Sequence, residues 1–207
     1  MTGLLLLVSL ASAAPTPSVS QDAVSGTTAP GAWGIVAQGG YPWSAVRAFG
    51  GVHPRLTVFG EVDTALFRRI QPTVGLNVDL VSGAVGRLTA EVGLGWQFQW
   101  GELPQSGASA VVRIKGSVTG GRVTAFLHAS TRHTLLADRT RWISEDGERV
   151  SWAFRHGWTP GGQLGLAVRI TPMVGLEAGL GWRIGDVGTY AFSLPSFHGG
   201  IHIGGGR

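Results

Sequence analysis

The 207-residue sequence contains no cysteine, a single lysine and few charged residues of either sign. The absence of cysteine excludes disulfides and thiolate metal sites, so a hydrophobic core or a lipid bilayer must supply the stabilising burial. Charged residues make up 14% of the chain, whereas an ordinary soluble domain has about 25%. Glycine is abundant, with 34 residues. Scarce charge combined with abundant glycine indicates a surface that largely avoids water.

Positive charge is present but is not concentrated in any segment. Lys115 is the only lysine among 16 basic residues, and the net charge is +4. A nucleic-acid-binding protein gathers such charge on one face, so the sequence predicts no nucleic-acid partner. Phosphate-cradling glycine loops that lead from a strand into a helix are also missing. We therefore expect no cofactor.

The N-terminal segment has the features of an export signal. Residues 4–10 are apolar (LLLLVSL), and Ala11, Ser12, Ala13 and Ala14 follow. A short apolar run before small residues predicts a signal peptide over 1–13, cleaved after Ala13 or Ala14. Residues 14–30 are rich in Pro, Ser and Thr, which predicts a disordered leader. No other apolar run reaches the ~20 residues that a transmembrane helix needs, so any membrane contact must use strands.

From residue 31 onward, apolar and polar residues alternate with a period of two. The clearest example is 87–100, where Leu88, Ala90, Val92, Leu94, Trp96, Phe98 and Trp100 share one face and polar residues or glycine occupy the other. Successive strand side chains point to opposite sides, so this pattern predicts a strand. Similar segments are 56–63, 73–80, 108–117, 123–132, 163–170 and 174–183, with weaker ones near 32–38, 44–52 and 196–204.

The connections between these segments alternate in length. Short turns are expected at 53–54, 82–86, 119–121 and 171–173, and longer loops near 65–71, 100–106, 134–161 and 185–194. Short turns at one end and long loops at the other describe an up-and-down antiparallel meander. The sequence therefore predicts an all-β fold over 31–207, a closed antiparallel barrel of 8–10 strands.

Alternation alone fits a soluble barrel with an apolar interior as well as a transmembrane barrel with an apolar exterior. The composition of the polar face favours the transmembrane barrel, because it is rich in small residues and its charges nearly balance. These charges predict an ion-pair network that plugs the lumen: Arg47, Glu61, Asp63, Asp79, Glu91, Arg113, Lys115, Arg132, Arg169, Glu177 and Arg183. Aromatic residues near the long loops predict an interfacial girdle: Trp43, Trp96, Phe98, Trp100, Trp158, Trp182 and Tyr190.

This pattern over 31–207 resembles the small outer-membrane β-barrel proteins of the OmpA/OmpX type. The resemblance implies residence in the bacterial outer membrane, in contact with its lipid and lipopolysaccharide. It also implies periplasmic chaperones and the barrel-assembly machinery as partners during insertion. A barrel of this size has a lumen that its own side chains can fill.

Few residues suggest chemistry. His128 and Ser130 share a strand face and resemble the His-x-Ser dyad of outer-membrane lipid A deacylases, but the surrounding motif is missing and the pair is expected to face the lumen. His198 and His202 also share a face, yet four strand residues separate them by about 13 Å, too far to bind one metal ion. We therefore expect no metal site and treat His128 and Ser130 as lumen filling.

The loop at 134–161 is the candidate interaction surface. A turn signal at 144–148 lies between two aromatic segments and predicts a hairpin that extends beyond the membrane. Its aromatic and arginine residues suit lipopolysaccharide phosphates or a protein partner. We expect a structural or surface-interaction barrel with a plugged lumen and no catalysis. A small-solute channel and a lipid A-modifying hydrolase are the alternatives.

Overall fold

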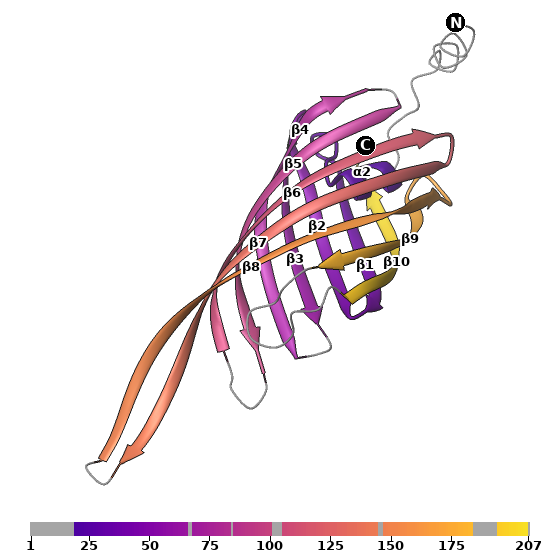
Figure 1. Ribbon diagram of the computed structural model, residues 1–207. Helices are drawn as coiled ribbons and strands as arrows, with labels where there is room; N and C mark the ends of the chain where they lie inside the picture. The colour runs from indigo at the N-terminus through magenta and orange to yellow at the C-terminus, as the bar shows by residue number, and fades with distance from the viewer. Residues whose placement is uncertain are drawn as a thin grey trace, which may run out of the picture.

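The computed structural model describes residues 19–65, 68–83, 85–100, 105–144, 147–183 and 194–206. Ten antiparallel strands close into one transmembrane-type barrel (Figure 1), in which every strand pairs with its sequence neighbours and β1 pairs with β10. This confirms the predicted fold, at the upper limit of the expected strand number. Among the described residues, no helix has the length and hydropathy required to cross a bilayer.

The strands lengthen toward the middle of the chain. Their bounds are β1 (Trp33–Tyr41), β2 (Trp43–His53), β3 (Leu56–Ala65), β4 (Arg69–Ser82), β5 (Gly86–Gln99), β6 (Gln105–Gly120), β7 (Val123–Ser144), β8 (Gly147–Arg169), β9 (Val174–Arg183) and β10 (Leu194–Gly205). One short helix, α2 (Val19–Ser25), precedes them.

The two ends of the barrel differ. The start of β1 and the end of β10 lie at the same end as the connections at 54–55, 83–85, 121–122 and 170–173, and we call this the short-turn end. The opposite end, the loop end, carries the remaining connections. Parts of these, at 101–104 and 184–193, lie outside the described residues. The alternation of connections follows the predicted meander.

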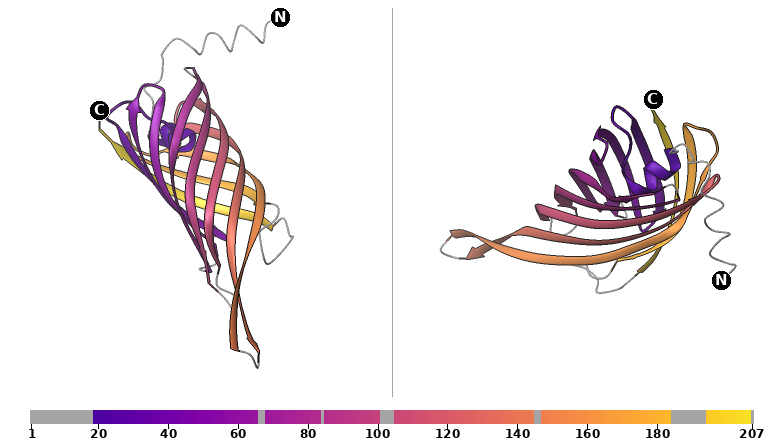
Figure 2. Two further views of the ribbon diagram at one scale, coloured as in Figure 1. Left: turned by 90° about the vertical axis from the view of Figure 1, so that its left-hand side faces the viewer. Right: turned by 90° about the horizontal axis from the view of Figure 1, so that it is seen from above.

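The predicted loop at 134–161 is instead a continuation of two strands. β7 runs on to Ser144 and β8 starts at Gly147, whose φ of +117° suits a tight turn. The pairing of β6 with β7 ends at Ala137, and the pairing of β8 with β9 begins only at Gly161. Residues 138–153 therefore pair only with one another and form a two-stranded ribbon, which projects from the loop end (Figures 1 and 2).

The apolar face of the alternating strands points outward. Leu94 and Val74 are 69% and 67% exposed, whereas Asn77, Thr89 and Glu91 are fully buried in the lumen. A soluble barrel would have the reverse arrangement, with its apolar residues inside. The outward apolar face is therefore the expected lipid-facing surface, and the interior is polar.

Three phenylalanines are exceptions on the inward face. Phe49, Phe59 and Phe126 are buried, and each lies opposite a glycine of the next strand, in the pairs Gly34–Phe49, Phe59–Gly75 and Phe126–Gly165. A Cβ atom on Gly75 or Gly165 would lie 2.7 Å from the facing ring. The missing side chains let the rings lie against the barrel wall, which accounts for part of the glycine content.

The leader corrects the sequence-based expectation. Residues 14–30 are predicted to be disordered, yet Val19–Ser25 form α2, and residues 22–28 are buried inside the barrel (Figure 2). Gly26, with φ of +72°, ends the helix, and its backbone N–H donates to the carbonyl of Asp22. The chain then returns to the short-turn end to begin β1. A helix this short is marginal in water, so the lumen supplies the contacts that order it.

Candidate functional site

Helix α2 spans the lumen near the short-turn end. It packs against β1 and against β5 to β10, so it reaches most of the barrel wall. Two of its apolar side chains, Ala23 and Val24, pack against different parts of the wall. Ala23 belongs to a buried cluster with Val36, Phe49 and Phe59, and Val24 to another with Phe126 and Ala167. The inward phenylalanines thus form two sockets that receive the helix.

Polar contacts fix the helix on its other sides. Arg87 of β5 forms an ion pair with Asp22 at 3.2 Å. The carbonyl of Ser25 accepts hydrogen bonds from Asn77 Nδ2 and Thr89 Oγ1, both at 2.9 Å. These donors satisfy a helix-terminal carbonyl that has no partner within the helix. The C-terminal end of α2 is therefore tied to β4 and β5.

The returning segment is anchored in the same way. Thr27 Oγ1 donates to Asp79 Oδ1 at 2.9 Å and accepts from Arg87 Nη1 at 3.0 Å. The backbone N–H of Thr28 donates to Thr57 Oγ1 at 3.0 Å, and its hydroxyl donates to Asp22 at 2.9 Å. Asp79, predicted as a lumen acid, thus contacts both Arg87 of the barrel wall and Thr27 of the returning segment.

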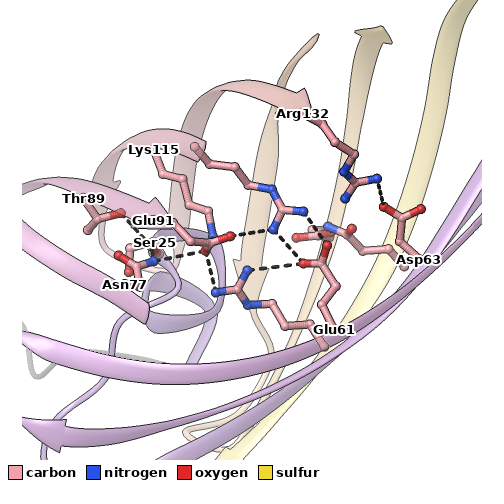
Figure 3. Close-up of polar contacts among 12 residues, drawn as sticks. Ser25, Glu61, Asp63, Asn77, Thr89, Glu91, Lys115 and Arg132 are labelled. Atoms are coloured by element: carbon pink, nitrogen blue, oxygen red, sulfur yellow. Dashed lines mark hydrogen bonds and ion pairs between the residues drawn. The ribbon is translucent and has the colours of Figure 1, made fainter. Parts of the chain in front are cut away.

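Five charged residues form a buried cluster beside the helix (Figure 3). Glu91 lies 2.6 Å from each of Arg47, Arg113 and Lys115, and Glu61 contacts both arginines. A buried charge is tolerated only with partners and hydrogen bonds. We call this group the central cluster. Its residues come from β2, β3, β5 and β6, so it covers one side of the lumen and leaves the side formed by β7 to β10 open.

A second group lies toward the loop end. Asp63 Oδ2 is 2.7 Å from Arg132 and 3.8 Å from Arg183. The guanidinium groups of Arg183 and Arg69 lie 4.4 and 4.5 Å from the ring centroid of Trp43. These distances are typical of cation–π contacts. Trp43, predicted for the lipid-facing girdle, instead points into the lumen, because it shares the inward face of β2 with Arg47 and Phe49.

The third group connects β1, β9 and β10. Glu177 accepts a hydrogen bond from Gln38 and lies 2.6 Å from Nε2 of the fully buried His202. His198 Nε2 is 3.9 Å from the same carboxylate. The two histidines, which are too far apart along the strand to share a metal, thus contact one acid. No group of three or more metal-ligating side chains occurs in the described part of the chain.

The structure therefore brings most of the predicted lumen charges into contact, in the three groups above and in the pairing of Asp79 with Arg87 beside α2. Arg169 is the exception, since it forms no ion pair with any described residue. The sequence analysis missed Asp22, Arg69 and Arg87, and it named His202 without assigning it an acidic partner. Arg87 lies on the polar face of the clearest strand, so the alternating pattern could have identified it. The pattern could not identify Asp22, because the segment around Asp22 does not alternate.

Most of the exposed aromatic residues lie at the loop end, whereas Trp33, at the start of β1, is exposed at the short-turn end. Trp96, Phe98, Trp100, Trp158 and Trp182 are exposed on the outer face, where the girdle was expected. Tyr41 and Phe197, which pair with each other across β1 and β10, are also exposed there. Tyr190 lies outside the described residues.

His128 and Ser130 face the lumen. Both line a cavity that also contacts α2, and His128 hydrogen-bonds to the backbone of Val24. His128 Nε2 has no hydrogen-bond partner in the described regions, so no bond joins it to Ser130 Oγ. A nucleophile and its base must be within hydrogen-bond reach. The arrangement fits lumen filling, and it points away from the lipid in which an acylated substrate would lie.

The cavity has a volume of about 100 Å³ and lies between the central cluster and the wall formed by β8 to β10. Trp43, Asp63 and Arg183 line it at the loop end. Ala23 and Val24 line it on the side of the short-turn end, so α2 is its floor. The lumen therefore has a remaining space, and the helix closes one side of it.

No protein-family model and no curated relative matches the chain. Solved barrels do match. The N-terminal β-barrel domain of Pseudomonas aeruginosa OprF covers 86% of this chain and 99% of its own, at 10% identity and a TM-score of 0.41. Neisserial surface protein A matches 84% of this chain and 96% of its own, at 14% sequence identity and a TM-score of 0.38. The translocator domain of autotransporter NalP from Neisseria meningitidis matches 90% of this chain and 92% of its own, at 11% sequence identity and a TM-score of 0.44. The likeness concerns the fold alone.

Proposed function

We propose that the chain is a bacterial outer-membrane barrel whose lumen is closed to solutes, and whose role is structural or surface-interacting. The observation that supports this proposal is the presence of a helix and a paired charged cluster inside the barrel. Helix α2 contacts β1 and β5 to β10, and the central cluster covers the side formed by β2 to β6. Because the groups that fill the lumen are paired with one another, water gains little by entering.

The outer surface supports a location in the membrane. Its strands carry exposed Leu, Val and Ile along their length, and exposed aromatic residues gather at the loop end. Contact of such an apolar surface with lipid costs little free energy, whereas its contact with water is unfavourable. The short-turn end, with the start of β1 and the end of β10, is the expected periplasmic side.

The ribbon of residues 138–153 supports an outward role. It projects past the other loop-end connections (Figure 1), and its pairing is confined to itself. At its base Phe154 and Trp158 are exposed. We propose that this surface contacts lipopolysaccharide or a protein partner.

Two measurements test the closed barrel. The purified wild-type protein should fold in detergent into a form whose gel mobility shifts on heating, and it should fractionate with outer membranes. In planar bilayers, it should give no steady conductance. A soluble distribution would contradict the membrane location. A large, steady current from the wild type would contradict the closed lumen and favour a small-solute channel.

A further inference from the structure

The barrel has two layers of closure that differ in how they are attached. The central cluster is built from side chains of the strands themselves, and it cannot leave without unfolding the wall. Within the described residues, α2 is joined covalently to the wall through residues 26–32, at the short-turn end. It can therefore swing out of that end with no strand pair broken.

The helix also closes the remaining cavity. Ala23 and Val24 form its floor, while its other walls come from β1, β2, β3 and β6 to β10. Withdrawal of α2 joins this cavity to the short-turn end. The wall that the helix leaves behind has two apolar sockets, and between them Thr57, Asn77 and Thr89 lose their contacts with the leader and become available to water.

The charge of the lumen sets the solute class. The barrel wall carries seven inward cations, Arg47, Arg69, Arg87, Arg113, Lys115, Arg132 and Arg183, and five inward carboxylates, Glu61, Asp63, Asp79, Glu91 and Glu177. Helix α2 contributes one further acid, Asp22, which leaves with it. The unplugged lumen thus has an excess of positive charge, and a ring of cationic side chains favours anions.

We infer that α2 is a removable plug over an anion-conducting pore. This inference assumes the membrane barrel proposed above but goes beyond its closed state. The ion pair of Asp22 with Arg87 is the contact best suited to a test, because each side can be reversed separately. Asp22→Arg replaces the carboxylate that lies 3.2 Å from Arg87 with a cation, and Arg87→Asp places a carboxylate near Asp22 and Asp79.

The experiment compares four full-length proteins in planar bilayers: the wild type, the two single variants, and the double variant Asp22→Arg/Arg87→Asp. Each single variant should give a steady conductance roughly tenfold or more above the background current recorded with the wild type, because like charges oppose the docked helix. The double variant restores an ion pair and should return toward the closed state. Asp22→Asn, which removes charge without reversing it, is the matched control. In a salt gradient, the open variants should pass chloride over potassium by roughly threefold.

A second measurement does not depend on current. The chain has no native cysteine, so Thr89→Cys provides a single thiol beneath the plug. A charged thiol reagent should label it slowly in the otherwise unchanged protein and roughly tenfold faster when Asp22→Arg/Val24→Asp is added, because Val24 then brings a charge into its apolar socket. Heat-modifiable mobility shows that each variant has kept its barrel.

The outcomes separate the two proposals. Steady wild-type current contradicts the closed lumen. The removable plug is contradicted if the single variants fold but give no conductance, or if the open variants prefer cations. It is also contradicted if the double variant conducts more than either single variant. An unchanged rate of labelling at Thr89→Cys would contradict it as well.

Discussion

At the scale of the residue, outward and inward positions differ in what they tolerate. The outward Leu94 is 69% exposed at mid-strand. We expect Leu94→Arg to lower the free energy of unfolding by roughly 2–4 kcal/mol in a bilayer, because the cation must lie in hydrocarbon. Urea titration in lipid vesicles measures this, with Leu94→Ala as the size control. Equal losses for the two variants would contradict the lipid-facing assignment.

Glu91 has the opposite environment. It is fully buried and balances three cations. Glu91→Gln should cost about 3 kcal/mol or more, because Arg47, Arg113 and Lys115 then share the single carboxylate of Glu61. Adding Lys115→Met removes one excess cation and should recover part of that loss. If the double variant is no more stable than Glu91→Gln in the same urea titration, the central cluster does not act as a coupled unit.

The residue scale also shows why the polar face was predictable and its pairings were not. Period-two alternation placed Glu61, Glu91 and Arg113 on one face, because strand geometry leaves no other choice. Which acid meets which base depends on the neighbours and on the stagger between strands. Trp43 is a different case: it shares the inward face of β2 with Arg47 and Phe49, so the alternation alone places it in the lumen, and the girdle prediction rested only on its aromatic character and its position at a strand end.

At the scale of the element, the ribbon and the helix behave differently. The ribbon's residues pair only with one another. Deleting 138–153 and joining Ala137 to Phe154 through Asn-Gly should therefore leave the barrel's unfolding free energy within about 0.5 kcal/mol of wild type, since a two-residue turn suits two paired strands. Heat-modifiable mobility and urea titration test this, and loss of the folded barrel would show that the ribbon is needed for assembly.

Helix α2 was beyond sequence-based prediction for a physical reason. Its seven residues, VSQDAVS, include poor helix formers and lie in a Pro-, Ser- and Thr-rich segment. Local signals for a helix are weak, and the apolar contacts that stabilise it come from residues 13 to more than 140 positions away, such as Val36 and Ala167. The strands, in contrast, carry their own pattern, which explains why they were predicted and the helix was not.

At the scale of the whole molecule, closure depends on β10. Ile201 pairs with Ala37 on one side and Leu176 on the other. Ile201→Pro removes a backbone donor from a strand with neighbours on both sides, so we expect loss of the heat-modifiable form. Ile201→Ala should retain it, because the backbone ladder stays complete. A normal mobility shift from the proline variant would mean that the barrel does not need this ladder.

The strand order has a consequence for how the chain folds. Nine of the ten ladders join strands that follow one another in sequence, and only the ladder of β1 with β10 joins distant segments. Hairpins can therefore form one after another at low contact order. The entropic cost of loop closure therefore arises mainly in one step, the pairing of β1 with β10, in which nine residue pairs form. Since α2 precedes β1, that step also encloses it, and the last ladder to form decides whether the helix ends up inside.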